Sequence, residues 1–393
     1  MGEALLSAVQ GYMYPNEVEL QWSILIVLYP FITGLVAGAF ILASLERVFN
    51  VQAVKPTYRL ALLTALAFLL VAPLPLQLHL GHPFRSYEMY LTPHTTSAMA
   101  MFGFVYIWYL MAVLLLEIWL DYRKEIVLLA RSESGWKGTI YKVLTLGVDN
   151  ISEASLKIDD RVGRFITIIG IPSAFLLHGY VGFIFGSVKA NPWWSTPVMP
   201  IVFLFSAIVS GIALVLLMYM ATCFLKGIEI DMPCVDTIAR YLFYAFLIDF
   251  SIEMLDLIHR IYEADESFQT LDFMVHTRLY TSQILVQIVF GTVVPIGFLA
   301  FTQLVKLSES ARKGIYVLAG VLTLIGIFAM RWNVVIGGQL FSKSFLGYTT
   351  YKMAFATKEG FLPAIVLLVL PFVILWGLVK LLPPWHEEPA ANV

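Results

Sequence analysis

Charged residues are scarce in this chain, and their scarcity argues against a soluble globular protein. Asp, Glu, Lys and Arg together make up 13% of the 393 residues, whereas 59% of the residues are hydrophobic. An average soluble domain carries about 25% charged residues. The formal net charge of −2 offers no basic field for a nucleic acid, so we expect no nucleic-acid partner.

Other absences narrow the chemistry. The two cysteines, Cys223 and Cys234, form no CxxC pair, which argues against a disulfide framework, a zinc site or an iron–sulfur cluster held by this chain alone. No P-loop and no dinucleotide-binding glycine motif is present. Residues 1–20 contain no Lys or Arg and so lack the basic start of a signal peptide. We expect no metal site and no covalent cofactor, and interpret 1–20 as a lead-in outside the membrane.

Long apolar runs separated by short polar segments dominate the rest of the chain. A run of about 20 apolar residues spans a bilayer, and backbone groups in lipid must bond within the segment, so each run predicts a helix. We therefore predict an all-α, polytopic membrane bundle of about nine spans in residues 21–382, with two four-helix groups plus an extra helix conceivable. The spans lie near 21–46, 58–81, 97–120, 163–186, 197–224, 237–261, 279–305, 313–341 and 360–382.

The distribution of Lys and Arg predicts the orientation, because cytoplasmic loops carry an excess of both. With the N-terminus outside, most basic residues fall inside. The outer exceptions are Arg85, Lys189, Arg260, Arg278, Lys343, Lys352 and Lys358. We therefore expect a cytoplasmic (inner) membrane protein with an outer N-terminus, a cytoplasmic loop at 121–162 and a cytoplasmic tail at 383–393. The loop is a plain connector or a docking segment for a cytoplasmic partner.

Two polar clusters fall near the expected outer face, where six of the seven histidines lie. The first follows the second span and contains His79 and Arg85; the second, in the fourth span, contains His178 and Tyr180. Polar residues inside a membrane are costly and are therefore functional candidates. The plainer interpretations are an interfacial aromatic belt for the first cluster and a buried histidine bonded to a carbonyl for the second.

The expected sixth span carries the sharpest signal. Asp249, Glu253, Asp256 and Arg260 follow one another at steps of four, three and four, which places them on one helical face. Three carboxylates stacked in a membrane are typical of a proton-transfer path; the alternative is an ion-pair network that fixes helix packing. Arg331, inside the eighth span, needs a partner at that depth, and we expect an acid of the sixth span to supply it.

A pocket with histidine, tyrosine, arginine and carboxylates near a membrane interface suits a quinone. Its two carbonyls need hydrogen-bond donors, and its reduction needs protons as well as electrons. The chain contains no evident electron carrier of its own, so electrons would come from a partner subunit.

At these residues the sequence resembles the NrfD/PsrC family, the membrane subunits of polysulfide-reductase-type complexes. The resemblance rests on Gly-Leu-Val-Ala-Gly-Ala-Phe in the first span, on His79-Leu-Gly-His82-Pro followed by Thr92-Pro93-His94, and on the His178 region. Family members usually have arginine or a similar residue where His82 stands. The long form of the chain, with Arg331 near its end, is also similar to the membrane subunit of quinone-linked nickel–iron hydrogenases. Met330 to Gln339 and the closing Leu-Leu-Pro-Pro-Trp resemble the P subunit of the Dsr transmembrane complex of sulfur metabolism.

The resemblance implies a subunit of a respiratory complex that binds menaquinone or a related quinone near the outer face. It implies an iron–sulfur (ferredoxin-like) partner with cubane clusters there, beside other membrane subunits and a cytochrome c or cytoplasmic catalytic subunit. His79, His178 and Tyr180 would be carried over as quinone-pocket residues, with Arg85 beside them. Asp249, Glu253 and Asp256 would exchange protons, and Arg260 and Arg331 would balance their charge.

Three alternatives remain open at this point. A haem b anchor would use His79 and His178 as ligands on neighbouring spans, and we expect at most one haem there. A proton or solute transporter without redox chemistry would account for the sixth span alone, although the sequence contains no pair of broken helices meeting at the midplane. A passive anchor would have no reason to carry the intramembrane acids.

Overall fold

The structure is a computed structural model, and it describes residues 9–92, 94, 96–263 and 267–385. Most of these residues are helical, which confirms the all-α prediction. The two short strands β1 (Gln10–Gly11) and β2 (Gly347–Tyr348) pair antiparallel. Parts of the predicted outer lead-in (1–8) and cytoplasmic tail (386–393), together with Pro93 of the family motif, lie outside the described residues.

The long helices follow the apolar runs. They are α2 (Ile24–Arg47), α3 (Tyr58–Val71), α6 (Ala98–Trp108), α7 (Leu116–Ser132), α9 (Glu153–Gly186), α10 (Met199–Lys226), α11 (Met232–Glu263), α13 (Val294–Leu304), α14 (Glu309–Val335) and α15 (Phe361–Leu381). Two π-helical stretches, η4 (Tyr109–Leu115) and η5 (Tyr280–Val293), continue into α7 and α13. The shorter helices are α4 (Leu74–His79), α5 (Glu88–Leu91), α8 (Gly135–Leu144) and α12 (Phe268–Thr277), with 3₁₀ turns η1 (Pro15–Glu17), η2 (Gln52–Thr57), η3 (Pro83–Arg85) and η6 (Gly337–Gln339).

Eight helical segments of the described chain are long and apolar enough to cross a membrane. They match eight of the nine expected spans, and the chain is a multi-pass integral membrane protein. The remaining expected span, 237–261, the sixth along the chain, is α11, a helix of 32 residues. Its length would suffice, but α11 carries Asp249, Glu253, Asp256 and Arg260 within its second half, and it is not among the eight apolar segments.

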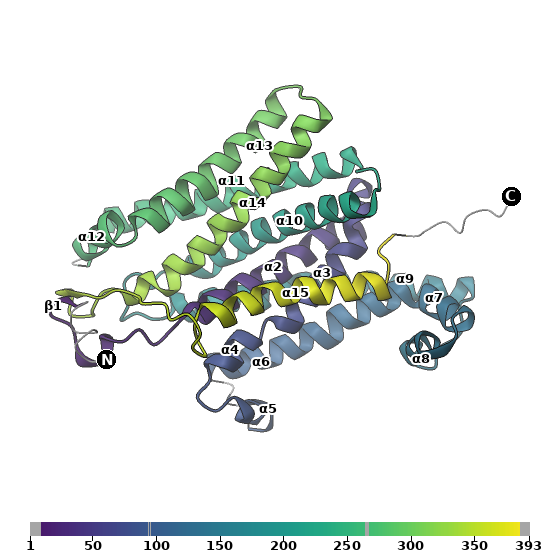
Figure 1. Cartoon of the computed structure of the whole chain (residues 1–393), viewed down its shortest axis with the longest axis horizontal. Helices are drawn as coiled ribbons and strands as arrows, with labels where there is room; N and C mark the ends of the chain where they lie inside the picture. Colours follow the sequence, from purple (N-terminus) through teal and green to yellow (C-terminus); the bar gives the residue numbers. More distant parts are fainter. Residues whose placement is uncertain (1–8, 93, 95, 264–266, 386–393) are drawn as a thin grey trace.

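For description we divide the bundle by chain order into a first group, up to α9, and a second group, from α10 to α14, with α15 beside the first (Figure 1). In the first group α2, α3, the η4–α7 segment and α9 pack against one another. In the second group α10 contacts α11 and α14, and α14 contacts the η5–α13 segment. Helix α15 lies against α3. The most extensive helix–helix contact crosses between the groups, because α10 packs on α2, and α10 also packs on α9. The structure thus confirms the predicted polytopic helical bundle, and the two groups are parts of one packed unit.

The closest contact between the groups is the seam of α2 and α10. A side chain on Gly211 of α10 would collide with the backbone of Gly38 in α2, and a side chain on Gly38 would collide with Ala207. Gly34, the other glycine of the GxxxG pattern, lies against the imidazole of His178. The small residues of the first span therefore serve packing inside the chain, because they let the two helix backbones approach closely.

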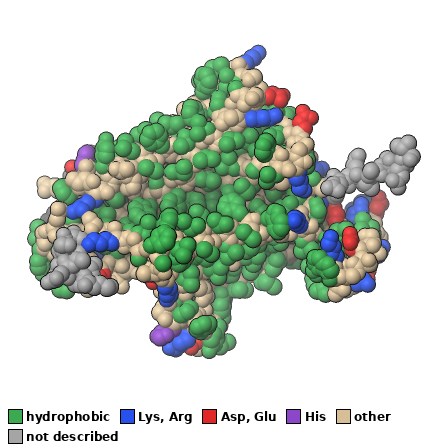
Figure 2. All heavy atoms as spheres, viewed as in Figure 1, with side chains coloured by type: hydrophobic (Ala, Val, Ile, Leu, Met, Phe, Trp, Pro, Cys, Tyr) green, Lys and Arg blue, Asp and Glu red, His purple; other side chains and the backbone are tan. Residues whose placement is uncertain are grey.

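The bundle has two distinct ends (Figure 1). We call the end that bears β1, β2 and α12 the strand end, and the opposite end, which bears α8, the α8 end. Figure 2 shows apolar side chains over the middle of the visible face and charged side chains mainly toward its extremities. The segment 121–162, predicted to be a cytoplasmic loop, is largely helical, because α7 continues to Ser132 and is followed by α8 and the start of α9. Which end faces the cytoplasm stays a prediction.

Candidate functional site

The acids of α11 face a cavity near the strand end of the second helix group. The cavity has a volume of about 390 Å³ and lies between α11, α12, η5, α14 and the start of α10. Most of its lining is apolar, with Trp193, Met199, Leu257, Ile284 and Met330 among the contributing side chains. A volume of about 300–1,000 Å³ with a few polar groups is typical of a small-molecule site.

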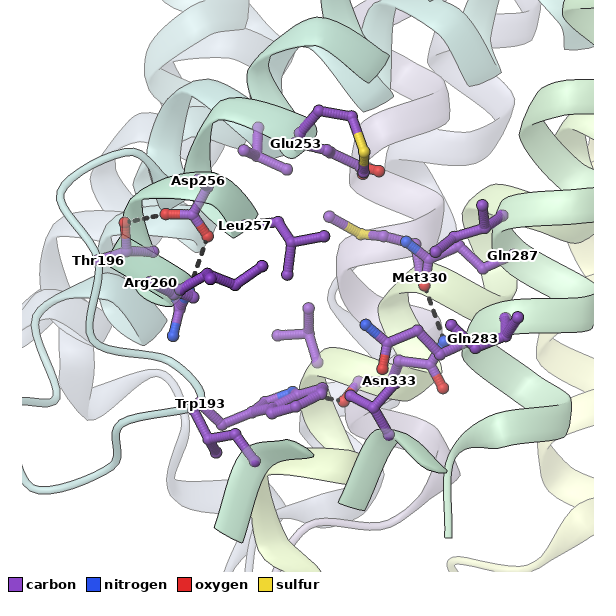
Figure 3. Close-up of a pocket in the computed structure, with 18 of the residues that line it drawn as sticks. Trp193, Thr196, Glu253, Asp256, Leu257, Arg260, Gln283, Gln287, Met330 and Asn333 are labelled. Carbon is purple, nitrogen blue, oxygen red and sulfur yellow. Dashed lines mark hydrogen bonds and ion pairs between the residues drawn. The ribbon is translucent and has the colours of Figure 1, made fainter. Parts of the chain in front are cut away.

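Polar groups stand on opposite walls of this cavity (Figure 3). On one wall Asp256 accepts a hydrogen bond of 2.6 Å from Thr196 and pairs with Arg260 at 2.9 Å. On the other wall the Asn333 amide donates to Gln287 at 2.8 Å, and the Gln287 side chain lies near the carboxyl of Glu253. The cavity thus presents a carboxylate–guanidinium pair opposite two amides, with the Glu253 carboxyl between these walls.

Asp249 continues the acidic face of α11 into the protein. Its side chain is 2% exposed, and its Oδ1 atom has no hydrogen-bond partner in the described part of the chain. Glu253 and Arg331 are the charged groups that act on it electrostatically. The predicted common face therefore leads from the cavity, where Asp256 and Glu253 lie, to the buried Asp249.

Arg331 of α14 is fully buried and contacts side chains of α9 and α10. Its guanidinium donates to Nε2 of His178 at 3.0 Å and to the hydroxyl of Ser206 at 2.7 Å, and it stacks over the ring of Phe203 at 4.0 Å from the ring centroid. Asp249 and Glu253 act on Arg331 electrostatically without a direct ion pair among the described contacts. The acids of α11 thus balance the charge of Arg331 as expected, but they do not touch it. The side chains that hydrogen-bond to Arg331 include His178 and Ser206.

These contacts determine the tautomer of His178. A guanidinium has only donors, so Nε2 of His178 must accept, and the ring proton is on Nδ1. Nδ1 lies 3.2 Å from the Thr33 hydroxyl, which donates in turn to the Tyr29 carbonyl at 3.0 Å. Both ring nitrogens of His178 are therefore engaged in a closed chain between α2, α9 and α14, which leaves neither free to ligate a haem iron.

The four residues predicted to bind quinone lie in separate places. His178 is in the Arg331 network, and Tyr180, on the same helix, stacks on Phe102 at 6.1 Å between ring centroids. His79 ends α4 and contacts Glu359 at 3.0 Å. Arg85 is exposed and paired with Glu88 at 2.8 Å. The structure thus places none of the four in the cavity of α11.

Several polar residues of the site escaped the sequence analysis. Gln287, Asn333 and Thr196 look like ordinary polar residues in apolar or loop segments, and no spacing rule connects them. Gln339, in η6 after the end of α14, bonds the backbone of Trp22 at 2.9 Å and 3.1 Å. Glu117 could have been found from the sequence. It is a carboxylate inside the third apolar run, and an intramembrane carboxylate was the feature that singled out Glu253.

Comparison with known proteins places the chain in a family. The family model described as polysulphide reductase, NrfD, matches residues 14–343. The chain is 29% identical over 328 residues to a selenate reductase subunit of Mesobacillus selenatarsenatis, covering 80% of this chain and 73% of that protein. It is 25% identical to the Hdr-like menaquinol oxidoreductase integral membrane subunit of Archaeoglobus fulgidus, with 88% and 77% covered.

A shorter match supports the same grouping. Protein NrfD of Escherichia coli is 29% identical over 202 residues, which cover 51% of this chain and 59% of that protein. The narrower resemblance to the P subunit of the Dsr complex stays a prediction, because the matches point to the family and not to that member. Since the family model covers most of the chain, the protein belongs to the polysulphide reductase NrfD family of membrane proteins.

Proposed function

We propose that this protein is the quinone-reactive membrane subunit of a respiratory oxidoreductase complex. It exchanges electrons between menaquinone or a related quinone and an iron–sulfur partner subunit, and it handles the accompanying protons. The partner would sit at the strand end, which we propose to be the outer face of the cytoplasmic membrane. The names of two relatives, a selenate reductase subunit and a menaquinol oxidoreductase subunit, support this class of complex.

The cavity of α11 carries the proposal. Its apolar lining and volume of about 390 Å³ suit a flat ring, and its opposite walls offer the donors and proton-carrying groups that two ring oxygens need. Arg260 and the amides of Gln287 and Asn333 can donate hydrogen bonds, while Glu253 and Asp256 can carry protons. When bound, a quinone would take up or release two electrons and two protons; the chain binds, orients and supplies protons.

The buried acids provide the inward end of a proton path. Glu253 lines the cavity and Asp249 lies behind it, near Arg331. Two acids act on one arginine there, so a single proton can be shared between the acids without leaving a surplus of buried charge. We therefore propose Glu253 and Asp249 as the inner proton-transfer pair and Asp256 as the acid at the cavity wall.

In this proposal His178 is a positioning residue. It touches Arg331 and Thr33 and not the cavity, so it would act by fixing the guanidinium that balances Asp249 and Glu253. His79, Arg85 and Tyr180 are kept as candidates for a different quinone position, in the first helix group. The Tyr180 hydroxyl, which is buried and lacks a partner in the described part of the chain, supports that second position.

One pair of variants tests the location. Leu257 lines the cavity, whereas Leu255 on the same helix is 65% exposed and lies outside it. We expect Leu257→Trp to fill the cavity, so the purified complex retains little quinone and its KM for quinol rises at least tenfold. Leu255→Trp should retain wild-type values. Normal quinone retention in Leu257→Trp together with its loss in His79→Ala or Tyr180→Phe would move the site to the first helix group.

The same preparation separates the competing functions. Extracted quinone and a reduced-minus-oxidised spectrum without a haem band from this subunit support the proposal. A haem band that disappears on replacing His79 or His178 would identify a haem b anchor, against which the engaged nitrogens of His178 already argue. Neither quinone nor haem would favour a proton or solute transporter.

A further inference from the structure

A second buried carboxyl lies in the first helix group, toward the α8 end. Glu117 of α7 is fully buried. Its Oε1 lies 3.1 Å from the hydroxyl of Tyr58 on η2–α3 and 2.7 Å from the hydroxyl of Thr167 on α9. Its Oε2 has no hydrogen-bond partner within the described residues. A buried ionised carboxylate normally has donors on both oxygens, so this environment is poor for a permanent charge.

The bonds of Thr167 fit a carboxyl that carries a proton. The Thr167 hydroxyl has one hydrogen, yet it lies within bonding distance of two acceptors, Glu117 at 2.7 Å and the Gly163 carbonyl at 3.0 Å. If Glu117 is protonated, it donates to Thr167, which donates on to Gly163, and both contacts become hydrogen bonds. If Glu117 is ionised, the hydroxyl can satisfy only one of the two.

The cation that acts on Glu117 also forms ion pairs with other acids. Arg47 of α2 is the cation that acts on Glu117, and it also pairs with Asp121 at 3.5 Å and Asp160 at 3.3 Å. Tyr58 and Tyr109 are the other titratable groups that face Glu117. Arg59 holds Asp121 more closely, at 2.7 Å, and also pairs with Glu125 at 3.1 Å. Both arginines are therefore engaged by other acids, and a proton on Glu117 would remove a buried negative charge that has no direct ion pair within the described residues.

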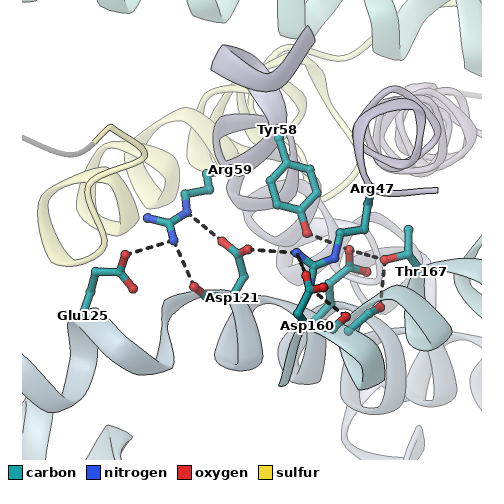
Figure 4. A network of polar contacts seen from close by, with 9 residues as sticks. Arg47, Tyr58, Arg59, Asp121, Glu125, Asp160 and Thr167 are labelled. Atoms are coloured by element: carbon teal, nitrogen blue, oxygen red, sulfur yellow. Dashed lines mark hydrogen bonds and ion pairs between the residues drawn. The ribbon is translucent and has the colours of Figure 1, made fainter. Parts of the chain in front are cut away.

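Water can reach this cluster from the α8 end. A polar crevice of about 260 Å³ lies there, with Arg47, Arg59, Asp121 and Asp160 in its lining. Figure 4 shows these side chains linked by ion pairs, with Tyr58 and Thr167 at the inner side of the network. Asp121 lies one helical turn from Glu117 on α7 and faces the crevice, so protons from water have a short route to Glu117 through the ion-pair network.

We propose that Glu117 is a second proton-exchange site of this protein, open to water at the α8 end and separate from the acids of α11. The exchange forms and breaks one O–H bond: the carboxylate takes a proton from water or hydronium in the crevice and returns it there, and no electrons move. This proposal does not depend on the quinone cavity, because the two sites lie in different helix groups.

Carbodiimide labelling and infrared spectroscopy of the full chain in proteoliposomes test the proposal. Dicyclohexylcarbodiimide reacts with protonated carboxyls in apolar surroundings, so peptide mass spectrometry should find the label on Glu117 at neutral pH and lose it as the pH rises. The infrared spectrum should contain a protonated carboxyl band that shifts in deuterium oxide. The component of this band that belongs to Glu117 should be lost in Glu117→Gln and retained in Asp160→Asn, whose acid is largely exposed. The remaining component would belong to the acids of α11.

Sidedness gives the decisive result. In oriented proteoliposomes, a pH step on the α8 side should change the Glu117 band, and the same step on the strand side should leave it unchanged. An unlabelled Glu117 with no such band would show a permanently ionised anchor that ties α3, α7 and α9 together, and would overturn the proposal. Peptide mass spectrometry locates the carbodiimide label in the wild-type chain, so a poorly folding Glu117→Gln would not block the test.

Discussion

The two helix groups each bury a carboxyl beside an arginine, but they treat the arginine differently. In the first group Arg47 lies near the α8 end, partly exposed, and pairs directly with Asp121 and Asp160. In the second group Arg331 is fully buried and its direct partners are the neutral His178, Ser206 and Phe203. Arg331 thus balances the negative charge of Asp249 and Glu253 without a direct ion pair, whereas Arg47 forms ion pairs with its acids.

This difference indicates which cluster depends on its arginine for stability. Water at the α8 end can solvate Arg47 and its acids when one partner is removed. The interior around Arg331 offers no such compensation, and the loss of one member leaves others buried and unpaired. The second group should therefore be the less tolerant one, and matched substitutions in the two groups can test this.

The largest effect is expected for the two arginines. Arg331→Met should destabilise the folded protein by about 3–5 kcal/mol, because it leaves the buried Asp249 and the half-buried Glu253 without a balancing cation. Arg47→Met should cost about 1 kcal/mol, since its ion pairs are partly exposed. Thermal unfolding of the detergent-purified chain would measure both. Equal losses for the two variants would mean that the environments of the arginines do not differ as described.

Replacing the buried acids by amides tests function instead of stability. Glu253→Gln should lower proton-dependent quinol turnover roughly a hundredfold, because the side chain at the cavity can no longer carry a proton. Quinone retention should stay close to that of the wild type, since the amide preserves the shape of the wall. A variant that only fails to assemble would instead support the ion-pair interpretation of α11.

Sequence reasoning identified the acidic face of α11 because its acids share one helix. Asp249, Glu253 and Asp256 are separated by helical steps, so one segment of sequence predicts a common face. The cavity could not be predicted this way, because Gln287 and Thr196 reach it from other elements. The bond between His178 and Arg331 joins residues 153 positions apart, and its geometry depends on the packing of α9 and α14 against α10.

A substitution at the contact between α2 and α10 should lower the stability of the protein by an intermediate amount. Gly211→Val would force α10 away from Gly38 of α2, and overpacking of this kind costs about 1–3 kcal/mol. A matched change at Gly377 of α15, where an added side chain meets open space, should cost less than about 1 kcal/mol. Thermal unfolding of both variants would measure the difference, and equal stability would show that α2 and α10 can separate without loss.

The smallest expected effect compares two threonines. Thr33 bonds the neutral ring of His178, and Thr167 bonds Glu117. A hydrogen bond between neutral groups contributes about 0.5–1.5 kcal/mol, and one to a charged group about 1.5–3 kcal/mol. If Glu117 holds a proton at neutral pH, Thr33→Val and Thr167→Val should therefore destabilise the protein equally, by about 1 kcal/mol.

Raising the pH should then separate the two threonine variants. Once Glu117 loses its proton, the hydroxyl of Thr167 bonds a charged group, and the cost of Thr167→Val should grow while that of Thr33→Val stays constant. Thermal unfolding of the two variants and the wild type across roughly pH 6 to 9 would follow this change, in the range where a buried carboxyl can titrate. A larger cost for Thr167→Val already at the lowest pH would show that Glu117 is ionised throughout, and the two clusters would then differ in position but not in chemistry.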